Sequence, residues 1–273
     1  MAARNTLHDL VLAGDIGGTK TLLQIGVLGQ DRYTVLRERR FDSRAYRGLQ
    51  PMVRAFIGNR HAILAACFGV AGPVAGNCAK ITNLPWEVDA RSIGRALATQ
   101  RVRLINDFAA VAYGIDALEK NDVYALQKGK PVVDGQRAIV GAGTGLGVGF
   151  MTWHDDHYEV ISSEGGHVDF APTDKQQIEL LEFLSRRLGR VRYEDVLSGT
   201  GLVNIYEFLK HKTAAKKSAK LRNRVAGGDV AAAIAAASHD DPLAAQAMRI
   251  FTAIYGACAG NLALLGLAHG GVY

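Results

Sequence analysis

The sequence predicts an α/β protein in which two units repeat one theme. Segments 10–28 and 138–150 each show an apolar run, a glycine-rich turn and a second apolar run, which is the pattern of a β-hairpin. The two hairpins lie about one domain length apart, which indicates a duplicated fold. Between them, the apolar run 102–105 ends at Asn106-Asp107 and a helical pattern follows, so strands and helices alternate.

The length of 273 residues suggests about two domains, and we expect the first at residues 1–115 and the second at 116–273. A hydrophobic content of 48% and a charged content of 21% are ordinary for a globular protein. The net charge of +6 tolerates an anionic ligand. Because the basic residues are scattered and the aromatic residues are few, no nucleic-acid partner is expected.

The three cysteines, Cys67, Cys78 and Cys258, are odd in number and far apart, with no spacing that suits zinc or a disulfide framework. A reducing intracellular setting is the expectation for such cysteines. The N-terminus lacks an apolar run of signal-peptide length. We therefore expect a cytoplasmic protein.

The uncharged segment 250–268 has the length of a transmembrane helix. It is rich in glycine and alanine, contains Asn261 and follows Asp241-Pro242, a helix cap with a proline in the first turn. We expect a buried helix that its neighbours approach closely, and no membrane partner.

The turn of the first hairpin, Gly14 to Lys20, has the composition of a phosphate-binding loop. Its glycines let backbone N–H groups approach a phosphate, Thr19 adds a hydroxyl, and Asp15 could bind Mg²⁺ through water. An ordinary Gly-Gly turn is the alternative. A P-loop is disfavoured because Thr19 stands where that motif needs glycine, and because a strand rather than a helix follows.

The rest of the first unit alternates helices, strands and turns. In chain order we expect a charged, irregular segment 32–50, a helix 51–58, a buried strand 62–70, a sharp turn at Gly72-Pro73, a rigid turn 82–86 and a helix 91–99. In the rigid turn, the polar side chains of Thr82 and Asn83 are available to a ligand.

Asn106 and Asp107 follow a buried strand, and in open α/β sheets ligands bind beyond the carboxyl ends of the strands. A carboxylate held there, partly desolvated and fixed by the next helix, is placed to accept a proton from a substrate hydroxyl. The alternative is that either residue only caps the helix, since both types are favoured N-caps.

In the second hairpin, Thr144 lies among glycines as Thr19 does. No register of this segment gives G-x-G-x-x-G, which removes the dinucleotide fingerprint. A glycine-rich turn without a ligand is the alternative to a second phosphate cradle.

Glu164 and His167 follow the second hairpin and lie three residues apart across two glycines. A carboxylate and an imidazole so placed can point into one pocket and match neighbouring sugar hydroxyls. A structural histidine is the alternative.

The remainder of the second unit is mostly helical. We expect a capped helix 174–188, a further carboxylate at Glu194, a small-residue turn 198–201 whose helix N-terminus favours an anion or a nucleotide edge, a helix 202–209, a solvated basic segment 211–224, and helices at 230–238 and from 243 onward.

Five motifs together resemble the bacterial glucokinase family of the actin/hexokinase superfamily. They are GDIGGTK at 14–20, LINDF at 104–108, GAGTGLGVG at 141–149, SEGGH at 163–167 and YEDVLSGTGL at 193–202. They span nearly the whole chain. The resemblance implies two ribonuclease-H-like domains with a cleft between them, and phosphorylation of the glucose 6-hydroxyl by ATP with Mg²⁺.

The resemblance also assigns roles to individual residues. It implies that Asp107 is the catalytic base. The glucose ligands are then Asn106, Asp107, Glu164, His167 and Glu194, with Asn83 beside them. The nucleotide and phosphate ligands are Gly14, Asp15, Ile16, Gly17, Gly18, Thr19, Thr144, Gly145, Ser198, Gly199, Thr200 and Gly201. Because no cysteine follows His167 in Asp169-Phe-Ala-Pro-Thr, the zinc-binding branch of related sugar kinases is disfavoured and no zinc is expected.

The chain ends on Gly270-Gly271-Val272-Tyr273, where family members continue through a glycine-rich strand and a final helix. That departure suggests a C-terminus truncated at the start of a strand. Kinases of another hexose and a non-catalytic sugar-binding remnant stay open as alternatives, and a homodimer is compatible with the sequence.

Overall fold

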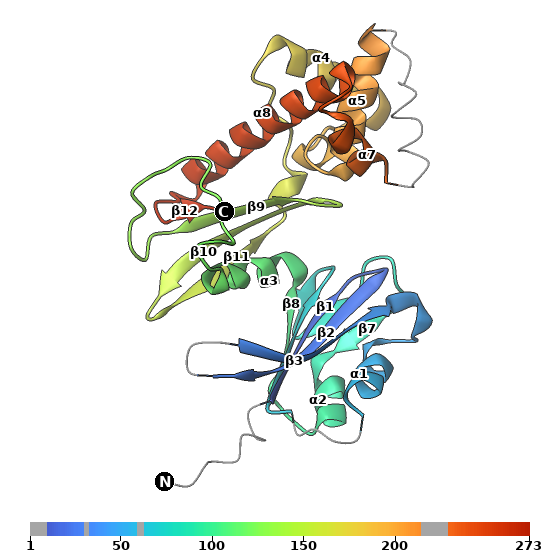
Figure 1. Cartoon of the computed structure of the whole chain (residues 1–273), viewed down its shortest axis with the longest axis vertical. Coiled ribbons are helices and arrows are strands. Elements are labelled where there is room, and N and C mark those ends of the chain that lie inside the picture. Colours follow the sequence, from blue (N-terminus) through green and yellow to red (C-terminus); the bar gives the residue numbers. More distant parts are fainter. Residues whose placement is uncertain (1–9, 30–32, 59–62, 214–228) are drawn as a thin grey trace. The chain divides into compact units, whose positions relative to one another are not determined.

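The computed structural model describes residues 10–29, 33–58, 63–213 and 229–273 (Figure 1). The chain forms two compact units, Met1–Gly114 and Ile115–Tyr273. Each unit combines a β-sheet with helices, so the predicted α/β class is confirmed.

The first unit alternates strands and helices. In chain order its elements are β1 (Leu10–Ile16), β2 (Lys20–Leu28), β3 (Tyr33–Asp42), a 3₁₀ turn (Ser43–Ala45), α1 (Leu49–Ile57), β4 (Ala65–Val70), β5 (Val74–Ala75), β6 (Cys78–Lys80), β7 (Glu87–Asp89), α2 (Ala90–Leu97), β8 (Val102–Asn106) and α3 (Asp107–Gly114).

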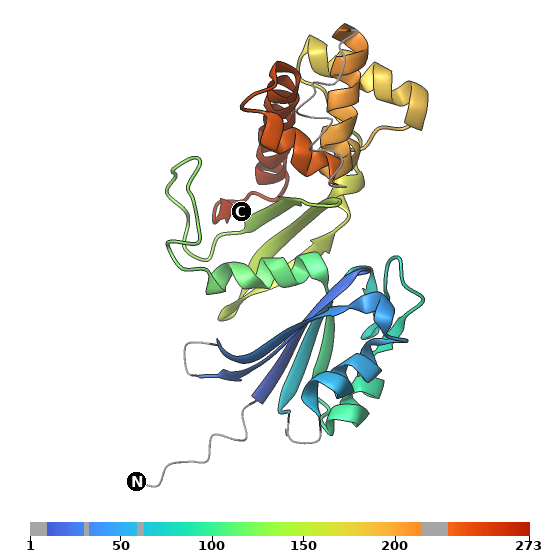
Figure 2. The same cartoon turned by 45° about the vertical axis from the view of Figure 1, so that its right-hand side comes forward.

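Five of these strands form one sheet in the order β3-β2-β1-β4-β8, while β5, β6 and β7 form a small antiparallel sheet. In the larger sheet, β1 and β2 are the antiparallel arms of the first hairpin, and β4 and β8 run parallel to β1. Helices α1 and α2 pack on one face of this sheet, where Leu12, Phe68 and Phe56 belong to one buried cluster (Figure 2). The parallel strands bring their carboxyl ends, Ile16, Val70 and Asn106, to the same edge.

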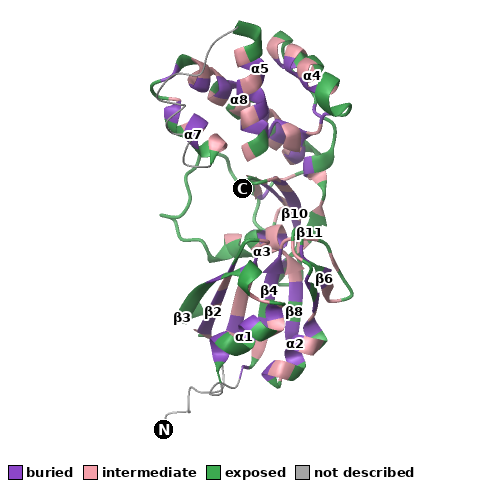
Figure 3. Cartoon of the chain, turned by 90° about the vertical axis from the view of Figure 1, so that its right-hand side faces the viewer, coloured by how far each residue is buried: buried purple, intermediate pink, exposed green. Residues whose placement is uncertain are grey.

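The expectation of an irregular segment at 32–50 is wrong. Residues Tyr33–Asp42 form the edge strand β3, paired with β2 along its length. All of its side chains except Phe41 are exposed (Figure 3), so neither face carries the apolar alternation from which a strand is recognised. The charged side chains also protect an open sheet edge from pairing with another chain.

The second unit places a sheet beside a group of helices. In chain order its elements are a 3₁₀ turn (Ile115–Ala117), β9 (Arg137–Ala142), β10 (Leu146–His154), β11 (His157–Ser163), a 3₁₀ turn (Gly165–His167), α4 (Lys175–Leu188), a 3₁₀ turn (Tyr193–Asp195), α5 (Gly199–Thr213), α7 (Val230–Ala237), α8 (Pro242–Leu265) and β12 (Gly271–Val272). Most of the expected basic segment, residues 214–224, lies outside the described residues.

The sheet of the second unit has the order β11-β10-β9-β12. Strands β9, β10 and β11 are antiparallel neighbours, and β12 runs parallel to β9. The first unit shows the same scheme with one strand more, because its three antiparallel strands are followed by two parallel ones, β4 and β8. The duplicated fold expected from the two hairpins is therefore present, and a strand does begin at Gly271.

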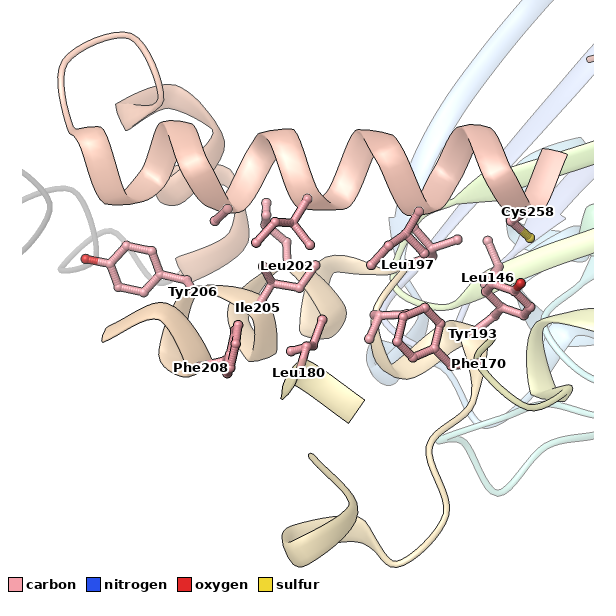
Figure 4. Packing of buried hydrophobic residues seen from close by; sticks show 14 of the residues in the cluster. Leu146, Phe170, Leu180, Tyr193, Leu197, Leu202, Ile205, Tyr206, Phe208 and Cys258 are labelled. Atoms are coloured by element: carbon pink, nitrogen blue, oxygen red, sulfur yellow. The ribbon is translucent and has the colours of Figure 1, made fainter. Parts of the chain in front are cut away.

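The core of the second unit lies where α4, α5, α7 and α8 meet the sheet. Figure 4 shows α8 above buried side chains that include Leu197, Leu202 and Ile205. Tyr255 of α8 donates its hydroxyl to the Val140 carbonyl of β9 at 2.9 Å, which ties this helix to the sheet.

The expectation that α8 is buried and closely approached holds for one face only. Its buried residues, which include Ile250, Ile254 and Cys258, recur at helical spacing. Leu264 is 76% exposed, and a Cβ added at Gly256 or Gly260 would meet nothing within 4 Å. Among the described residues, α8 alone is long and apolar enough to cross a membrane by length and composition. Its packed face accounts for part of that composition, and the absence of a membrane partner stays a prediction.

Candidate active site

The turn of the first hairpin packs directly against the rigid turn at 82–86. The Gly17 amide donates to the Lys20 carbonyl at 3.0 Å and closes the hairpin. A Cβ on Gly18 would lie 2.7 Å from the Thr82 carbonyl oxygen, so only glycine allows this approach. Asn83, which is exposed and has a φ of +64°, therefore lies beside the predicted phosphate turn.

Two residues of the predicted phosphate motif, Gly14 and Ile16, have structural roles. A Cβ on Gly14 would lie 2.6 Å from Cδ1 of Phe68 and 2.9 Å from Cδ2 of Leu23, so this glycine makes room for the core. Ile16 is fully buried, and its carbonyl accepts the Ala71 amide at 3.0 Å. The exposed members of the motif are Asp15, Thr19 and Lys20.

Asn106 and Asp107 differ in the hydrogen bonds that their side chains make. Asn106 is the helix cap: its Oδ1 accepts the amides of Phe108 at 3.0 Å and Ala109 at 3.2 Å, and its Nδ2 donates to the Gly72 carbonyl at 3.3 Å. Asp107 is half-buried, and its Oδ1 accepts the Phe108 amide at 2.9 Å. Its other oxygen, Oδ2, has no hydrogen bond to the described part of the chain, so it can accept a proton from a ligand.

Asp15 and Asp107 lie close enough to affect each other. Although Asp15 reaches solvent, loss of part of its hydration raises the pKa of its carboxyl, and the negative charge of Asp107 raises it further. Two neighbouring carboxylates at the end of a sheet are a donor set that suits Mg²⁺, which binds through one or two carboxylates, water and phosphate oxygens. The described residues contain no group of three or more His, Cys, Asp or Glu side chains that could hold a metal by themselves. The donor set therefore fits a cation that arrives with phosphate.

The turn of the second hairpin contacts the carboxylate of Glu194, 48 residues further along the chain. Glu194 Oε2 accepts the Leu146 amide at 3.0 Å. A Cβ on Gly145 would lie 2.5 Å from the same oxygen, so glycine is required for this contact. The Gly143 carbonyl accepts the Gly199 amide at 2.9 Å, which joins the turn to the first residue of α5. Gly145, Thr144, Gly199 and Glu194 thus lie together.

Glu164, His167 and Glu194 form one cluster of side chains. Nε2 of His167 lies 3.7 Å from Oε2 of Glu164, and its Nδ1 lies 3.9 Å from Oε1 of Glu194. The intervening glycines allow this, because a Cβ on Gly166 would lie 2.2 Å from the Leu146 carbonyl oxygen. The side chains of His167 and Glu164 are 45% and 83% exposed, so they are open to a ligand.

The segment 198–201 begins helix α5 three residues earlier than expected, at Gly199 rather than at Leu202. Ser198 is buried and caps the helix, because its hydroxyl accepts the Gly201 amide at 2.9 Å and donates to the Glu194 carbonyl at 2.8 Å. Its side chain is therefore occupied. Thr200 is exposed at the first turn of α5, where backbone N–H groups favour an anion.

Arg192 was missed by the motif analysis. Its guanidinium contacts the imidazole of His167 at 3.1 Å and binds Asp195 through two nitrogens. The sequence signal was an arginine two positions before Glu194, which is too common a feature to single out.

Each of the two duplicated α/β units has a glycine hairpin with exposed carboxylates beside it. One unit adds a cluster of carboxylates and an imidazole that suits hydroxyl groups. These features are typical of the class of sugar kinases. Comparison with known proteins supports this class. The glucokinase family model matches residues 12–273. The chain is 42% identical to the glucokinase of Nostoc punctiforme, over 97% of this chain and 83% of that protein.

Solved structures agree. The glucokinase from an Antarctic psychrotroph has a TM-score of 0.82 and 27% identity, and covers 97% of this chain and 81% of its own. A ROK family glucokinase from Streptomyces griseus, in complex with glucose and AMPPNP, has a TM-score of 0.58 and 21% identity, and covers 94% of this chain and 80% of its own. At this identity the similarity is one of fold. The chain belongs to the glucokinase family, and its fold is that of the actin/hexokinase sugar kinases.

Proposed function

We propose that this protein transfers the γ-phosphoryl group of MgATP to the 6-hydroxyl of glucose and releases glucose 6-phosphate and ADP. The observation that carries the proposal is the half-buried carboxylate of Asp107 at the end of a strand, whose Oδ2 has no hydrogen bond from the described residues, in a chain that belongs to the glucokinase family. A ROK family glucokinase with glucose and AMPPNP shares the fold, which is consistent with these substrates.

In the proposed mechanism, Asp107 is the catalytic base. Its Oδ2 accepts the proton of the sugar hydroxyl as the sugar oxygen attacks phosphorus. Its Oδ1 stays bonded to the Phe108 amide and keeps the carboxylate oriented. Glu164, His167 and Glu194 supply donors and acceptors for the other hydroxyls. Contacts of Asn83 and Asn106 with the sugar are part of the same proposal, although the side-chain amide of Asn106 already bonds to the backbone of Gly72, Phe108 and Ala109.

Phosphoryl transfer requires positioning and neutralisation of charge more than covalent chemistry. The exposed turns of both hairpins, with Thr19 and Thr144, and the first turn of α5 with Thr200 present the groups proposed to bind ATP phosphates. Mg²⁺ neutralises phosphate charge when bound with ATP, and Asp15 is the residue proposed to hold it through water. The negative charge of Asp107 beside Asp15 favours a cation at this place.

The test compares Asp107→Asn with Asp42→Asn. Asp42 is a matched control, because it also accepts a backbone amide, that of Arg44 at 3.0 Å, at the start of a helical turn. The asparagine at 107 keeps the size of the side chain but cannot accept the proton, so we expect glucose binding to persist while kcat falls by roughly 10²–10⁴-fold. A coupled assay for glucose 6-phosphate and calorimetry with glucose measure the two properties. Turnover by Asp107→Asn within tenfold of the parent would refute the role of the base.

The same assay, run with mannose and glucosamine at equal concentration, measures which hexose is preferred. A kinase of another hexose would show a higher kcat/KM for that sugar than for glucose. Calorimetry with MgATP tests the remaining alternative, since a non-catalytic remnant should bind glucose and give no heat with the nucleotide.

We also propose that the protein works in the cytoplasm. Cys67, Cys78 and Cys258 are all unpaired, and Cys67 is exposed, which fits a reducing compartment. Fractionation of cells that express the protein checks this, and sedimentation of the purified protein measures whether it forms the predicted homodimer.

A further inference from the structure

Arg192 is held firmly in place beside the proposed sugar site. Its backbone amide donates to Asp195 Oδ2 at 2.8 Å, its Nε donates to the same oxygen at 3.0 Å, and its Nη2 donates to Oδ1 at 2.8 Å. Partial burial alone would raise the pKa of Asp195, yet the hydrogen bonds from Arg192 outweigh that effect and the pKa is lowered. Bonding to Asp195 likewise raises the pKa of the Arg192 guanidinium. The pair is therefore a fixed ion pair.

The remaining nitrogen of this guanidinium points at a histidine ring. Nη1 of Arg192 lies 3.1 Å from Nδ1 of His167 with hydrogen-bond geometry. Arginine has five N–H donors and no acceptor, so His167 must be the acceptor. A ring nitrogen that accepts carries no proton, and a neutral imidazole then carries its proton on Nε2. Arg192 thus selects one tautomer.

Two carboxylates of the described residues also face the ring. Glu164 faces Nε2 at 3.7 Å and Glu194 faces Nδ1 at 3.9 Å, and both distances exceed hydrogen-bond length. Arg192 contacts both neighbouring carboxylates, with Nη2 at 3.9 Å from Glu194 Oε1 and at 2.8 Å from Asp195 Oδ1. The Nε2–H group is left free to donate to a ligand.

We propose that Arg192 is a positioning residue that keeps His167 as the Nε2–H tautomer, so that the imidazole donates a hydrogen bond to one sugar hydroxyl while Glu164 and Glu194 accept from hydroxyls. The role of the imidazole towards the sugar rests on the proposed function, whereas the assignment of the tautomer does not depend on it. The consequence is directional: the hydroxyl that faces His167 is bound through its oxygen lone pair, not only through its proton.

The direct test is a long-range ¹H–¹⁵N spectrum of the imidazoles in the full chain at about pH 8, without sugar. The His167 signals are assigned with His167→Gln. We expect an unprotonated Nδ1 and a protonated Nε2 in the parent protein. In Arg192→Met we expect a mixture of the two tautomers. Protonation of Nδ1 in the parent, or an unchanged tautomer in Arg192→Met, would overturn the inference.

Arg190→Met is the matched control. Arg190 also contacts residue 167, but its Nη2 donates at 3.1 Å to the backbone carbonyl of His167 and not to the ring. We expect this variant to keep the Nε2–H tautomer. If Arg190→Met shifts the tautomer as much as Arg192→Met does, the effect comes from general loosening of the segment and the inference fails. The parent spectrum decides the assignment even if Arg192→Met does not fold.

Kinetics give a second readout that a purely structural role would not move. We expect Arg192→Met to raise KM for glucose about tenfold, the factor expected for one lost charge-assisted hydrogen bond, with kcat changed less than twofold. In a series of deoxy and deoxyfluoro glucoses, fluorine can accept a hydrogen bond but cannot donate one. At the position that faces His167, the parent protein should use the deoxyfluoro sugar better than the deoxy sugar. This preference should disappear in Arg192→Met.

The two hypotheses fail in different ways. If glucose does not bind near this cluster, adding glucose leaves the His167 signals unchanged, and the proposed sugar site is refuted whatever the tautomer is. If glucose shifts those signals while Nδ1 carries the proton, the sugar site stands and the role of Arg192 is refuted.

Discussion

The substitution Gly145→Ala should weaken glucose binding without unfolding the protein. A Cβ at this position would lie 2.5 Å from Oε2 of Glu194. Because contacts between carbon and oxygen ordinarily lie at about 3.3 Å or more, the carboxylate oxygen must move by about 0.8 Å. The oxygen is the end of a flexible side chain, so it can give way, and the strain on the fold is small.

The movement removes a defined interaction. Glu194 Oε2 accepts the Leu146 amide at 3.0 Å, and a hydrogen bond to a charged group contributes about 1.5–3 kcal/mol. The Glu194 side chain is 26% exposed, so we take the lower figure of about 1.5 kcal/mol. In the proposed site, glucose binding would have to restore the orientation of this carboxylate, and the same energy lost from binding corresponds to roughly tenfold in affinity.

Gly143→Ala in the same turn is the matched control. A Cβ there would meet nothing within 4 Å, so it changes the turn without displacing Glu194. Calorimetry with glucose in the absence of nucleotide separates the sugar site from any effect on ATP phosphates. Glucose affinity of Gly145→Ala within twofold of the parent, or an equal loss in Gly143→Ala, would show that Glu194 is not positioned through this turn.

Three further predictions concern stability. Because the folded state raises the pKa of Asp15 above 3.8, the stability contributed by its protonation is present below that value and is lost as pH rises through the raised pKa. Asp15→Asn, neutral at every pH, should therefore raise the melting temperature at about pH 7 more than at about pH 3.5. An equal rise in melting temperature at both pH values would show that the charge of Asp15 is not the cause. Ser198→Ala should cost about 1–2 kcal/mol of unfolding free energy in urea, since it removes the cap of α5. Gly256→Ala should raise that free energy by about 0.5–1 kcal/mol, because α8 has open space there, whereas Gly14→Ala should lower it by about 1–3 kcal/mol through contact with Phe68. Equal effects of the two alanines would refute the packing argument.

Much of the proposed site could be predicted because its parts are local in the sequence. The turn at Gly17 and Gly18 forms within a few residues, and the strand end at Asn106 and Asp107 is visible as an abrupt change from apolar to polar residues. Glu164 and His167 come together because two glycines between them pack against β10. Such features depend on backbone preferences that the sequence states directly.

Strand β3 and helix α8 show where sequence patterns mislead. β3 is held by backbone pairing with β2 and exposes both faces, so its side chains carry no periodic signal. In α8 the alanines and glycines gave the same apolar pattern on all sides, and the sequence did not show which face the core would cover. Only the packed neighbours decide that.

The sequence by itself determined the two hairpins, the duplicated α/β fold and the residue types available for phosphate and sugar. The tertiary structure alone decided that Asn106 serves as the cap while Oδ2 of Asp107 receives no hydrogen bond from the described residues, that Glu194 binds the turn at Leu146, and that Arg192 faces His167. The physical reason is that these contacts join residues through hydrogen bonds whose lengths and directions depend on how complete elements pack. Chemical type is written in the chain, but the orientation of each polar group is fixed only when the surrounding core is in place.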